Sequence, residues 1–303
     1  MFDVVVVGHF AIDSILSRTT AVSKDTLGGP PTYVSLAARK LGAKVSVLSK
    51  VGKDFSKDYA RWLNANDIDL SGLKCISDAP TTRFLLRYND EERMLQLQCK
   101  APPITLEDVP DSLESRVIHV APIANELSGE VVDRLRTLTQ TLSLDPQGFV
   151  RGFDEDRHVF LKRWNDPHVL EQIDLYKSSS NEIRTITGLA NLKLAMERIR
   201  DYGAKVVIVT KGIKGSTILY EENFYEIPAC KPRAIRDLTG AGDAFIGAFL
   251  AEYTKRKDPV WCMCVGSAAA SFVVEAVGPA MFGEKKDIYE RASGIYEKEL
   301  LSD

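Results

Sequence analysis

The stretch Asp237-Leu-Thr-Gly-Ala-Gly-Asp243 stands directly before an apolar run of small residues, Ala244-Phe-Ile-Gly-Ala-Phe-Leu-Ala251. The glycines predict a tight turn, and the apolar run predicts a helix that begins at Ala244. A turn that opens a helix leaves backbone N–H groups unpaired, with the positive end of the helix dipole behind them. The stretch therefore predicts an anion-binding site. Its donors would be the N–H groups of Gly240, Ala241 and Gly242.

Asp243 lies among these donors, where its own negative charge would repel a resting phosphate. A carboxylate in this place is useful when it has to accept a proton. We therefore interpret Asp243 as a general base for a hydroxyl group, while the neighbouring N–H groups stabilise charge on a phosphoryl group in transfer. Taken alone, the same residues also describe an ordinary turn with an acidic helix cap, so the rest of the chain has to decide.

The composition narrows the class of protein. Of 303 residues 45% are hydrophobic, which is ordinary for a soluble globular protein. The chain has 39 Lys and Arg residues against 42 Asp and Glu residues, a formal net charge of −3. Because no basic field exists to attract nucleic acid or a membrane surface, we expect neither as a partner. The N-terminal run is too short for a secretory signal and no apolar stretch would span a membrane, which predicts a cytoplasmic protein.

Apolar runs alternate with amphipathic stretches along most of the chain. Five runs are typical of buried strands: Val4–Val7, Val45–Leu48, Val117–Val120, Leu142–Leu144 and Val206–Val209. Stretches of helical period lie between most of them: Tyr33–Leu41, Asp54–Asn66, Glu130–Gln140 and Leu192–Tyr202. This order predicts an α/β fold with a doubly wound, mostly parallel sheet flanked by helices. Because no linker or repeat interrupts it, we expect a single domain over residues 1–303.

One region departs from this alternation. Thr81–Tyr88 and Arg93–Lys100 alternate polar and apolar side chains and predict an antiparallel hairpin that turns at Asn89–Glu92. With the segment after Asp13, the hairpin would form a small β sheet from about residues 14–27 and 80–101. Such a sheet would serve as a lid, because phosphoryl transfer has to exclude water. An edge hairpin without a function is the alternative.

Two groups of residues follow predicted strands at the carboxyl edge of the sheet, where open α/β folds bind ligands. Asp13 comes soon after the first strand and would accept hydrogen bonds from two hydroxyls of a polyol, or else cap a loop. Gly28 and Gly29 precede a Pro-Pro pair typical of a first helical turn, and they let the backbone approach a ligand closely. Gln147 and Arg151 follow a later strand and suit a hydroxyl-rich or phosphorylated ligand, although Asp-Pro before them is also a common turn opener.

Several motifs occur in the order and approximate spacing of the ribokinase-like, or PfkB-type, carbohydrate kinases. They are Gly8–Asp13, Gly28-Gly29, Lys50–Asp54, Val209–Gly215 and Asp237–Asp243. The resemblance covers essentially the whole chain, and its C-terminal motif is highly specific. Within the family the chain looks most like the myo-inositol kinases of plants and archaea, through Asp145–Arg151 and Val277–Phe282.

The resemblance implies a role for each matching residue. Asp243 would be the catalytic base, and the anion hole for the phosphates of ATP would consist of Gly240, Ala241 and Gly242. Further nucleotide contacts would come from Thr210, Gly212, Gly215, Thr239 and Ser179. The polyol would bind at Asp13, Gly28 and Gly29, with Gln147 and Arg151 beside them. Family members use Mg-ATP without a covalent enzyme intermediate, and the resemblance leaves a monovalent-cation requirement open.

Two positions depart from the family pattern. Many relatives carry Asn where this chain has Tyr33, so we expect an acceptor pocket lined differently from that of a ribokinase. Relatives also carry an Asn-x-x-Glu motif that helps to hold the magnesium shell, and here Ser179 replaces the Asn while Glu182 is kept. A serine still hydrogen-bonds water or a phosphate oxygen, so we expect activity, with Glu182 near the metal through water.

The sequence thus predicts an ATP-dependent kinase that phosphorylates a hydroxyl of a small polyol, with myo-inositol or a related cyclitol preferred and a hexose next. A nucleoside kinase on the same fold is the nearest alternative, because the pocket lining separates these substrates. A second alternative is a catalytically silent regulatory protein that binds nucleotide, and the presence of Asp243 disfavours it. A dinucleotide oxidoreductase is disfavoured because its Gly-x-Gly-x-x-Gly fingerprint is missing after the first strand. A monomer and a homodimer are both consistent with the residues.

Overall fold

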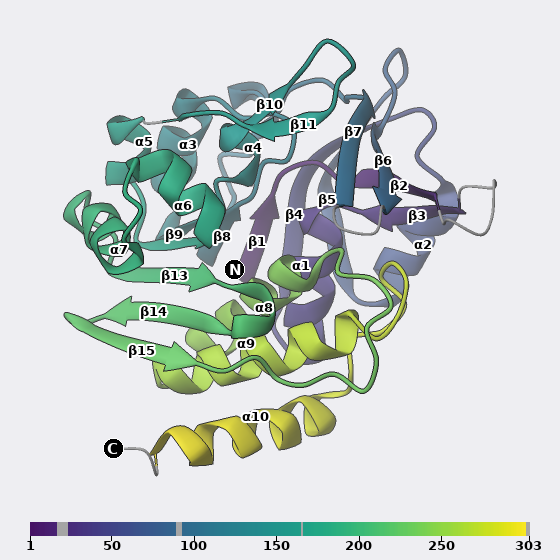
Figure 1. Ribbon diagram of the computed structural model, residues 1–303. Coiled ribbons are helices and arrows are strands. Elements are labelled where there is room, and N and C mark those ends of the chain that lie inside the picture. Colours follow the sequence, from purple (N-terminus) through teal and green to yellow (C-terminus); the bar gives the residue numbers. More distant parts are fainter. Residues whose placement is uncertain (17–23, 89–92, 165, 301–303) are drawn as a thin grey trace.

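The structure, a computed structural model, describes residues 1–16, 24–88, 93–164 and 166–300. Its largest element is a nine-stranded sheet in the order β15-β14-β13-β12-β9-β8-β1-β4-β5 (Figure 1). The strands are β1 Phe2–Val7, β4 Val45–Gly52, β5 Ile68–Ile76, β8 Ser115–Val120, β9 Thr139–Leu144, β12 Leu175–Ser179, β13 Val206–Thr210, β14 Ser216–Tyr220 and β15 Asn223–Ile227. The sheet is parallel from β5 to β13, and β14 and β15 add an antiparallel edge. The predicted doubly wound, mostly parallel sheet is confirmed.

Helices cover both faces of this sheet (Figure 1). Val4 and Val6 of β1 belong to one core, whereas Val5 and Val7 belong to the other, as alternating side chains of a buried strand must. The first core includes α1 Pro30–Lys40, α8 Ala241–Tyr253, α9 Pro259–Val273, α10 Lys285–Leu300 and, at its rim, α2 Lys57–Ala65. The second includes α3 Gly129–Arg136, α5 Pro167–Glu171, α6 Ser180–Thr187, α7 Leu192–Asp201 and part of the single turn α4 Gln147–Val150. Among the described residues, no helix is long and apolar enough to cross a membrane.

A second sheet of four strands stands beside the main one, in the order β3-β2-β6-β7 (Figure 1). Its strands are β2 Ala11–Leu16, β3 Lys24–Gly28, β6 Thr82–Tyr88 and β7 Arg93–Cys99. The predicted hairpin therefore forms as an antiparallel β6–β7 pair, while its turn, residues 89–92, lies outside the described residues. A short hairpin of β10 Arg151–Phe153 and β11 Val159–Leu161 reaches β7 through a bridge between Gln96 and His158. That the four-stranded sheet acts as a lid stays a prediction.

Some predicted boundaries were wrong. The helix predicted over Glu130–Gln140 ends at Arg136, because the chain turns and enters β9 at Thr139. The helix predicted from Asp54 begins at Lys57, where the Ser56 hydroxyl accepts the N–H of Asp58 and caps it. Strand β12 was not predicted at all, because Lys177, Ser178 and Ser179 break its apolar run.

Helices α1 and α8 approach each other closely through glycines. A Cβ added to Gly247 of α8 would lie 2.3 Å from the carbonyl oxygen of Val34 in α1. At the start of α8, a Cβ on Gly240 would lie 2.3 Å from the ring of Tyr33. Because real Cβ contacts are never this short, both positions require glycine. The close contact fixes the first turn of α1 against the beginning of α8.

We expect Gly247→Ala to destabilise the protein by about 1–3 kcal/mol, because the added methyl group forces the two helix backbones apart. Gly294→Ala is the matched control, since Gly294 lies in α10 with nothing within 4 Å of an added Cβ. That change removes a flexible residue from a helix and should be neutral or stabilising by about 0.5–1 kcal/mol. Urea unfolding of both variants measures the difference. Equal stabilities would contradict the close α1–α8 contact.

Candidate active site

The site is built on the turn that opens α8. Gly240 has a left-handed backbone with φ of 76° and stands at the N-cap, and α8 begins at Ala241 rather than at the predicted Ala244. The prediction was wrong because Gly242, a poor helix former in isolation, nevertheless lies within the first helical turn that follows the Gly240 N-cap. Asp243 consequently lies inside the first helical turn, where it faces the N-terminal end of the helix.

Asp237 stabilises the turn through hydrogen bonds from two backbone N–H groups. Its Oδ1 accepts the N–H of Thr239 at 2.9 Å, and its Oδ2 accepts the N–H of Gly278 at 3.2 Å. The N–H of Ala241 makes a long 3.4 Å contact with the carbonyl of Leu238. The first N–H groups of a helix have no acceptor within it, and together with the helix dipole they favour an anion at the start of α8. This is the arrangement that an anion hole needs.

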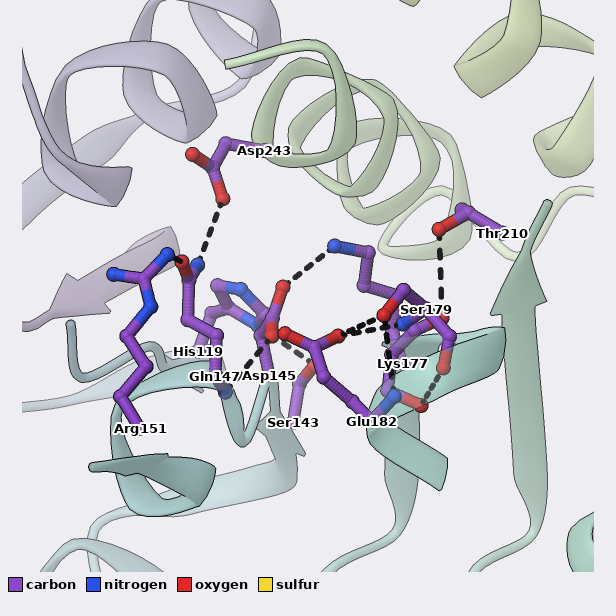
Figure 2. A network of polar contacts seen from close by, with 11 residues as sticks. His119, Ser143, Asp145, Gln147, Arg151, Lys177, Ser179, Glu182, Thr210 and Asp243 are labelled. Carbon is purple, nitrogen blue, oxygen red and sulfur yellow. Dashed lines mark hydrogen bonds and ion pairs between the residues drawn. The ribbon is translucent and has the colours of Figure 1, made fainter. Parts of the chain in front are cut away.

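A chain of hydrogen bonds reaches Asp243 from the opposite side (Figure 2). The Nε2 of Gln147 lies 3.4 Å from Oδ1 of Asp243 and donates toward it. Arg151 donates from Nη2 to Oε1 of Gln147 at 2.7 Å and from Nη1 to the carbonyl of Ile123 at 3.0 Å. The Arg151 guanidinium also lies over the ring of Phe84 in the four-stranded sheet, 5.7 Å from its centroid. The structure thus brings the two predicted substrate residues of this segment to the carboxylate.

The protonation of Asp243 is balanced by its surroundings. Burial disfavours the charged carboxylate and raises its pKa from 3.8 to about 6. Lys177 and Arg151 oppose this rise, whereas Asp145 and Glu182 add to it. A carboxyl group with a pKa near 6 is ionised at neutral pH and still basic enough to accept a proton during a reaction.

Lys177, on β12, is a residue of this site that the sequence analysis missed. Its Nζ lies 2.5 Å from Oδ2 of Asp145, and both side chains are buried. Asp145 also accepts the N–H of Gln147 on Oδ1, at 3.3 Å. Burial alone would lower the pKa of Lys177, but the carboxylates of Asp145, Asp243 and Glu182 raise it. A lysine just before a Ser-x-x-Glu capping box was the signal that could have revealed it.

Ser179 and Glu182 form that capping box at the start of α6. Oε2 of Glu182 accepts the N–H and the hydroxyl of Ser179, both at 2.7 Å, and the Ser179 hydroxyl accepts the N–H of Glu182 at 3.3 Å. Ser179 is paired with Thr210 across the parallel strands β12 and β13. Among the described residues, no three His, Cys, Asp or Glu side chains are grouped to hold a metal ion.

An apolar cavity of about 230 Å³ adjoins the turn. It is lined by residues of two predicted nucleotide-binding segments, Thr210, Gly212, Gly215, Ala241 and Gly242. Three large apolar side chains at its rim are exposed: Ile213 by 83%, Ile235 by 58% and Leu238 by 54%. Exposed apolar side chains gathered around one cavity are typical of a ligand site. Thr239 is buried and stands between this rim and Gly240.

The predicted polyol residues gather at the first turn of α1. Asp13 is buried on β2, and a Cβ on Gly28 would lie 2.1 Å from its Oδ2. Gly29, with φ of 81°, is the N-cap of α1, and α1 is packed against the α8 turn. That the acceptor pocket is lined differently from that of a ribokinase stays a prediction, and the structure shows where Tyr33 lies. The ring of Tyr33 is fully buried between Gly240 and Phe282. The centroids of the Tyr33 and Phe282 rings are 6.1 Å apart.

Comparison with known proteins identifies the family of this chain. Residues 1–285 match the pfkB family carbohydrate kinases. This chain belongs to the pfkB family. It is 29% identical to the cytidine kinase of Thermococcus kodakarensis, over 92% of this chain and 98% of that protein. It is also 29% identical to the inositol 3-kinase of Oryza sativa subsp. japonica, over 95% of this chain and 73% of that protein. A solved pyrophosphate-dependent kinase of the ribokinase family, complexed with a pyrophosphate analog and myo-inositol, shares the fold with a TM-score of 0.79 and 23% identity, over 96% of this chain and 100% of that one.

Membership of the pfkB family makes this protein a phosphotransferase that acts on a sugar or a nucleoside. The predicted family resemblance and ribokinase-like fold are confirmed. The roles of single residues, from Asp13 to Asp243, stay predictions.

If Asp243 is the base of this pfkB kinase, kcat/KM should fall as the pH drops through its pKa, because the protonated carboxyl group accepts no proton. We expect the acid limb of the profile to have its midpoint near pH 6, set by the free enzyme. Initial rates between pH 4.5 and 8.5, with donor and acceptor both well below saturation, measure it. If the midpoint of the acid limb instead lies close to the ordinary carboxyl pKa of 3.8, burial does not raise the pKa of the catalytic group.

Unfolding provides a check that needs no activity. The raised pKa means that the folded state holds the Asp243 proton more tightly than the unfolded state does. This contribution to stability is complete below pH 3.8 and is lost as the pH rises through about 6. Asp243→Asn should therefore be more stable than the natural protein at pH 7–8, by roughly 1–3 kcal/mol. A less stable variant would show that the charged carboxylate stabilises the fold.

Proposed function

We propose that this protein is an ATP-dependent kinase that transfers the γ-phosphoryl group to a hydroxyl of a small polyhydroxylated acceptor. One observation carries the proposal: the Asp243 carboxylate lies in the first turn of α8, at the positive end of the helix dipole and beside an apolar cavity that Ala241 and Gly242 line. A protein that only bound nucleotide would gain nothing from a carboxylate in its anion hole, because the charge repels phosphate. A base in this position has a use only if a proton is removed there.

The chemistry would proceed by positioning and electrostatics. Asp243 accepts the proton of the attacking hydroxyl, and Gln147 holds the orientation of its carboxylate. The turn N–H groups of Gly240, Ala241 and Gly242 stabilise the charge on the phosphoryl oxygens. Asp13, next to Gly28 and Gly29, accepts hydrogen bonds from other hydroxyls of the acceptor and so fixes which one faces Asp243.

The donor would extend from the turn toward the end of β13. Thr210, Gly212 and Gly215 line the cavity that receives the base, and Ser179 is the neighbour of Thr210 on β12. Mg²⁺ would neutralise charge on the transferring phosphoryl group. Oε2 of Glu182 is engaged in the capping box, so Glu182 would orient a water of the metal shell through Oε1.

The cavity supports a nucleotide rather than pyrophosphate as the donor. Its lining is mostly apolar, and a volume of about 230 Å³ next to the anion hole suits a planar base. Pyrophosphate has no apolar part that would gain from such a cavity. The structural neighbour with a pyrophosphate analog shares only the fold, so it does not decide the donor of this chain.

Filling the cavity should weaken ATP binding. Ala270, half-buried on α9, lines it, so Ala270→Leu should raise the KM for ATP about tenfold or more while kcat at saturating ATP stays within a few-fold. Ala65→Leu, exposed at the end of α2, is the matched control and should leave both constants unchanged. An unchanged KM in Ala270→Leu would show that the base of ATP binds elsewhere.

Three acceptor classes fit the proposal, and we place a nucleoside first. The similarity to the T. kodakarensis cytidine kinase covers 98% of that protein. The similarity to the O. sativa inositol 3-kinase covers only 73% of that protein, which is longer than this chain. myo-Inositol or a related cyclitol remains the second candidate, because identity to the inositol 3-kinase is also 29%. A nucleoside and a cyclitol both carry adjacent hydroxyls, which a carboxylate such as that of Asp13 can bind. A hexose is the third.

ADP release from Mg-ATP tests the proposal against a panel of cytidine, adenosine, myo-inositol, other cyclitols, fructose, glucose and ribose. We expect turnover with one class of acceptor, and a loss of at least about 10³-fold in kcat in Asp243→Asn with ATP affinity within a few-fold. The loss follows from removing the proton acceptor without changing the size of the side chain. Inorganic pyrophosphate as an alternative donor should give no turnover.

The other outcomes are equally informative. Turnover that persists in Asp243→Asn would remove Asp243 from the mechanism while leaving the kinase activity intact. ATP binding without turnover on any acceptor would favour the silent regulator instead. Activity on cyclitols with none on nucleosides would reverse the order of the two acceptor classes.

A further inference from the structure

The carboxylates around the α8 turn surround one buried ammonium group. Lys177 lies with 6% of its side chain exposed, and Asp145, its 2.5 Å partner, with 1%. Asp243 and Glu182 also act on its charge. A charge withdrawn from water this completely is costly, so a fold keeps one only where partners stabilise it. A buried lysine kept at this desolvation cost is a candidate for a functional role.

The ammonium group lies directly under the anion hole. A Cβ added to Gly242 would be 3.0 Å from Nζ of Lys177, so the lysine tip is in contact with the turn that carries the predicted phosphate donors. In Figure 2, Lys177 rises from β12, and its Nζ appears between Asp243 on one side and Thr210 on the other. Those two residues mark the acceptor and donor sides of the proposed reaction.

Asp145 fixes the direction of the lysine side chain and links it to Asp243. Lys177 donates to Oδ2 of Asp145, while Oδ1 accepts the N–H of Gln147, whose side chain donates toward Asp243. The ammonium group and the carboxylate of Asp243 are therefore two ends of one hydrogen-bonded chain. Both charges thus have protein partners in place before a phosphoryl group arrives, which reduces the reorganisation that its binding requires.

We propose that Lys177, anchored by Asp145 beneath Gly242, is the positioning residue that supplies the fixed positive charge of the phosphoryl-transfer site. The inference rests on the proposed function in so far as it assigns a role in transfer. Without this charge, only Arg151, which donates to Gln147, would oppose the negative charges that Asp145, Asp243 and Glu182 present to an incoming polyphosphate. With it, the turn attracts the donor and Asp243 stays ionised at neutral pH.

The groups that face Asp243 from neighbouring elements are Lys177 on β12, Asp145 after β9, Arg151 at β10 and Glu182 on α6. His119 on β8 is close enough to be influenced by Lys177, but burial lowers its pKa to about 3 and it remains neutral. Removal of Lys177 therefore takes away a positive charge that no nearby histidine replaces over the working pH range.

A second buried pair in the same chain provides a matched control. Lys50 and Asp108 also lie 2.5 Å apart with little exposure, 11% and 7%, but they connect β4 to the segment before β8. If Lys177 and Asp145 served only to stabilise the fold, removing either pair should have similar consequences. A role in transfer predicts a difference in activity and in anion binding.

The test compares Lys177→Met/Asp145→Asn with Lys50→Met/Asp108→Asn, each of which removes a buried lysine together with the carboxylate bonded to it. The second partner of Asp108, Lys74, is 47% exposed and keeps its contact with water. We expect the first variant to lose roughly 100-fold in kcat at pH 8, with acceptor KM within a few-fold. Its acid limb should move to higher pH, and its affinity for Mg-ADP, measured by calorimetry, should fall about tenfold. The control variant should match the natural protein in all four readouts.

Lys177→Arg keeps the charge and guards against a trivial loss of folding. It should retain the position of the acid limb and bind Mg-ADP within a few-fold of the natural protein. Equal kcat and equal Mg-ADP affinity in the two double variants would overturn the proposal, as would a Lys177→Arg variant that folds but binds Mg-ADP as weakly as Lys177→Met/Asp145→Asn. If the natural protein shows no turnover on any acceptor, the proposed function fails, and the Mg-ADP affinities alone decide the role of Lys177.

Discussion

The arrangement of the site depends on how closely α1 and α8 approach each other. Gly240 and Gly247 lie against Tyr33 and Val34 with no room for a Cβ, so the two helix backbones meet where side chains usually separate them. This contact holds the first turn of α8, with Asp243, against the first turn of α1, with its Gly29 N-cap. Two segments more than 200 residues apart in the sequence thus converge at one point.

Electrostatics at this point are set by burial and by partners rather than by net charge. Desolvation raises the pKa of Asp243 to about 6, and the positive charges of Lys177 and Arg151 restrain the rise. The Asp243 carboxylate therefore remains ionised at neutral pH and is a stronger base than a carboxylate with the ordinary pKa of 3.8. The same buried environment would strengthen each hydrogen bond from the α8 turn to a phosphoryl oxygen.

The sequence predicted the fold well, since runs such as Val4–Val7 and Val206–Val209 have few alternatives to buried parallel strands. It also identified the α8 turn, because a carboxylate among glycines at a helix start is chemically unusual. It missed β12 and Lys177, because polar residues interrupt that strand and their partners, Asp145 and the α8 turn, are distant in sequence. It marked Tyr33 as a departure from the family pattern, but only the packing against Gly240 shows that the ring is buried.

A crystal structure with Mg-ADP and aluminium fluoride, a mimic of the phosphoryl group in transfer, tests most directly whether the α8 turn is the site of phosphoryl transfer. We expect the fluoride group at the N-terminal end of α8, within hydrogen-bond distance of the turn N–H groups, with the Asp243 carboxylate facing it and adenine in the apolar cavity. A fluoride group bound away from α8, or an Asp243 carboxylate turned away from it, would contradict this assignment.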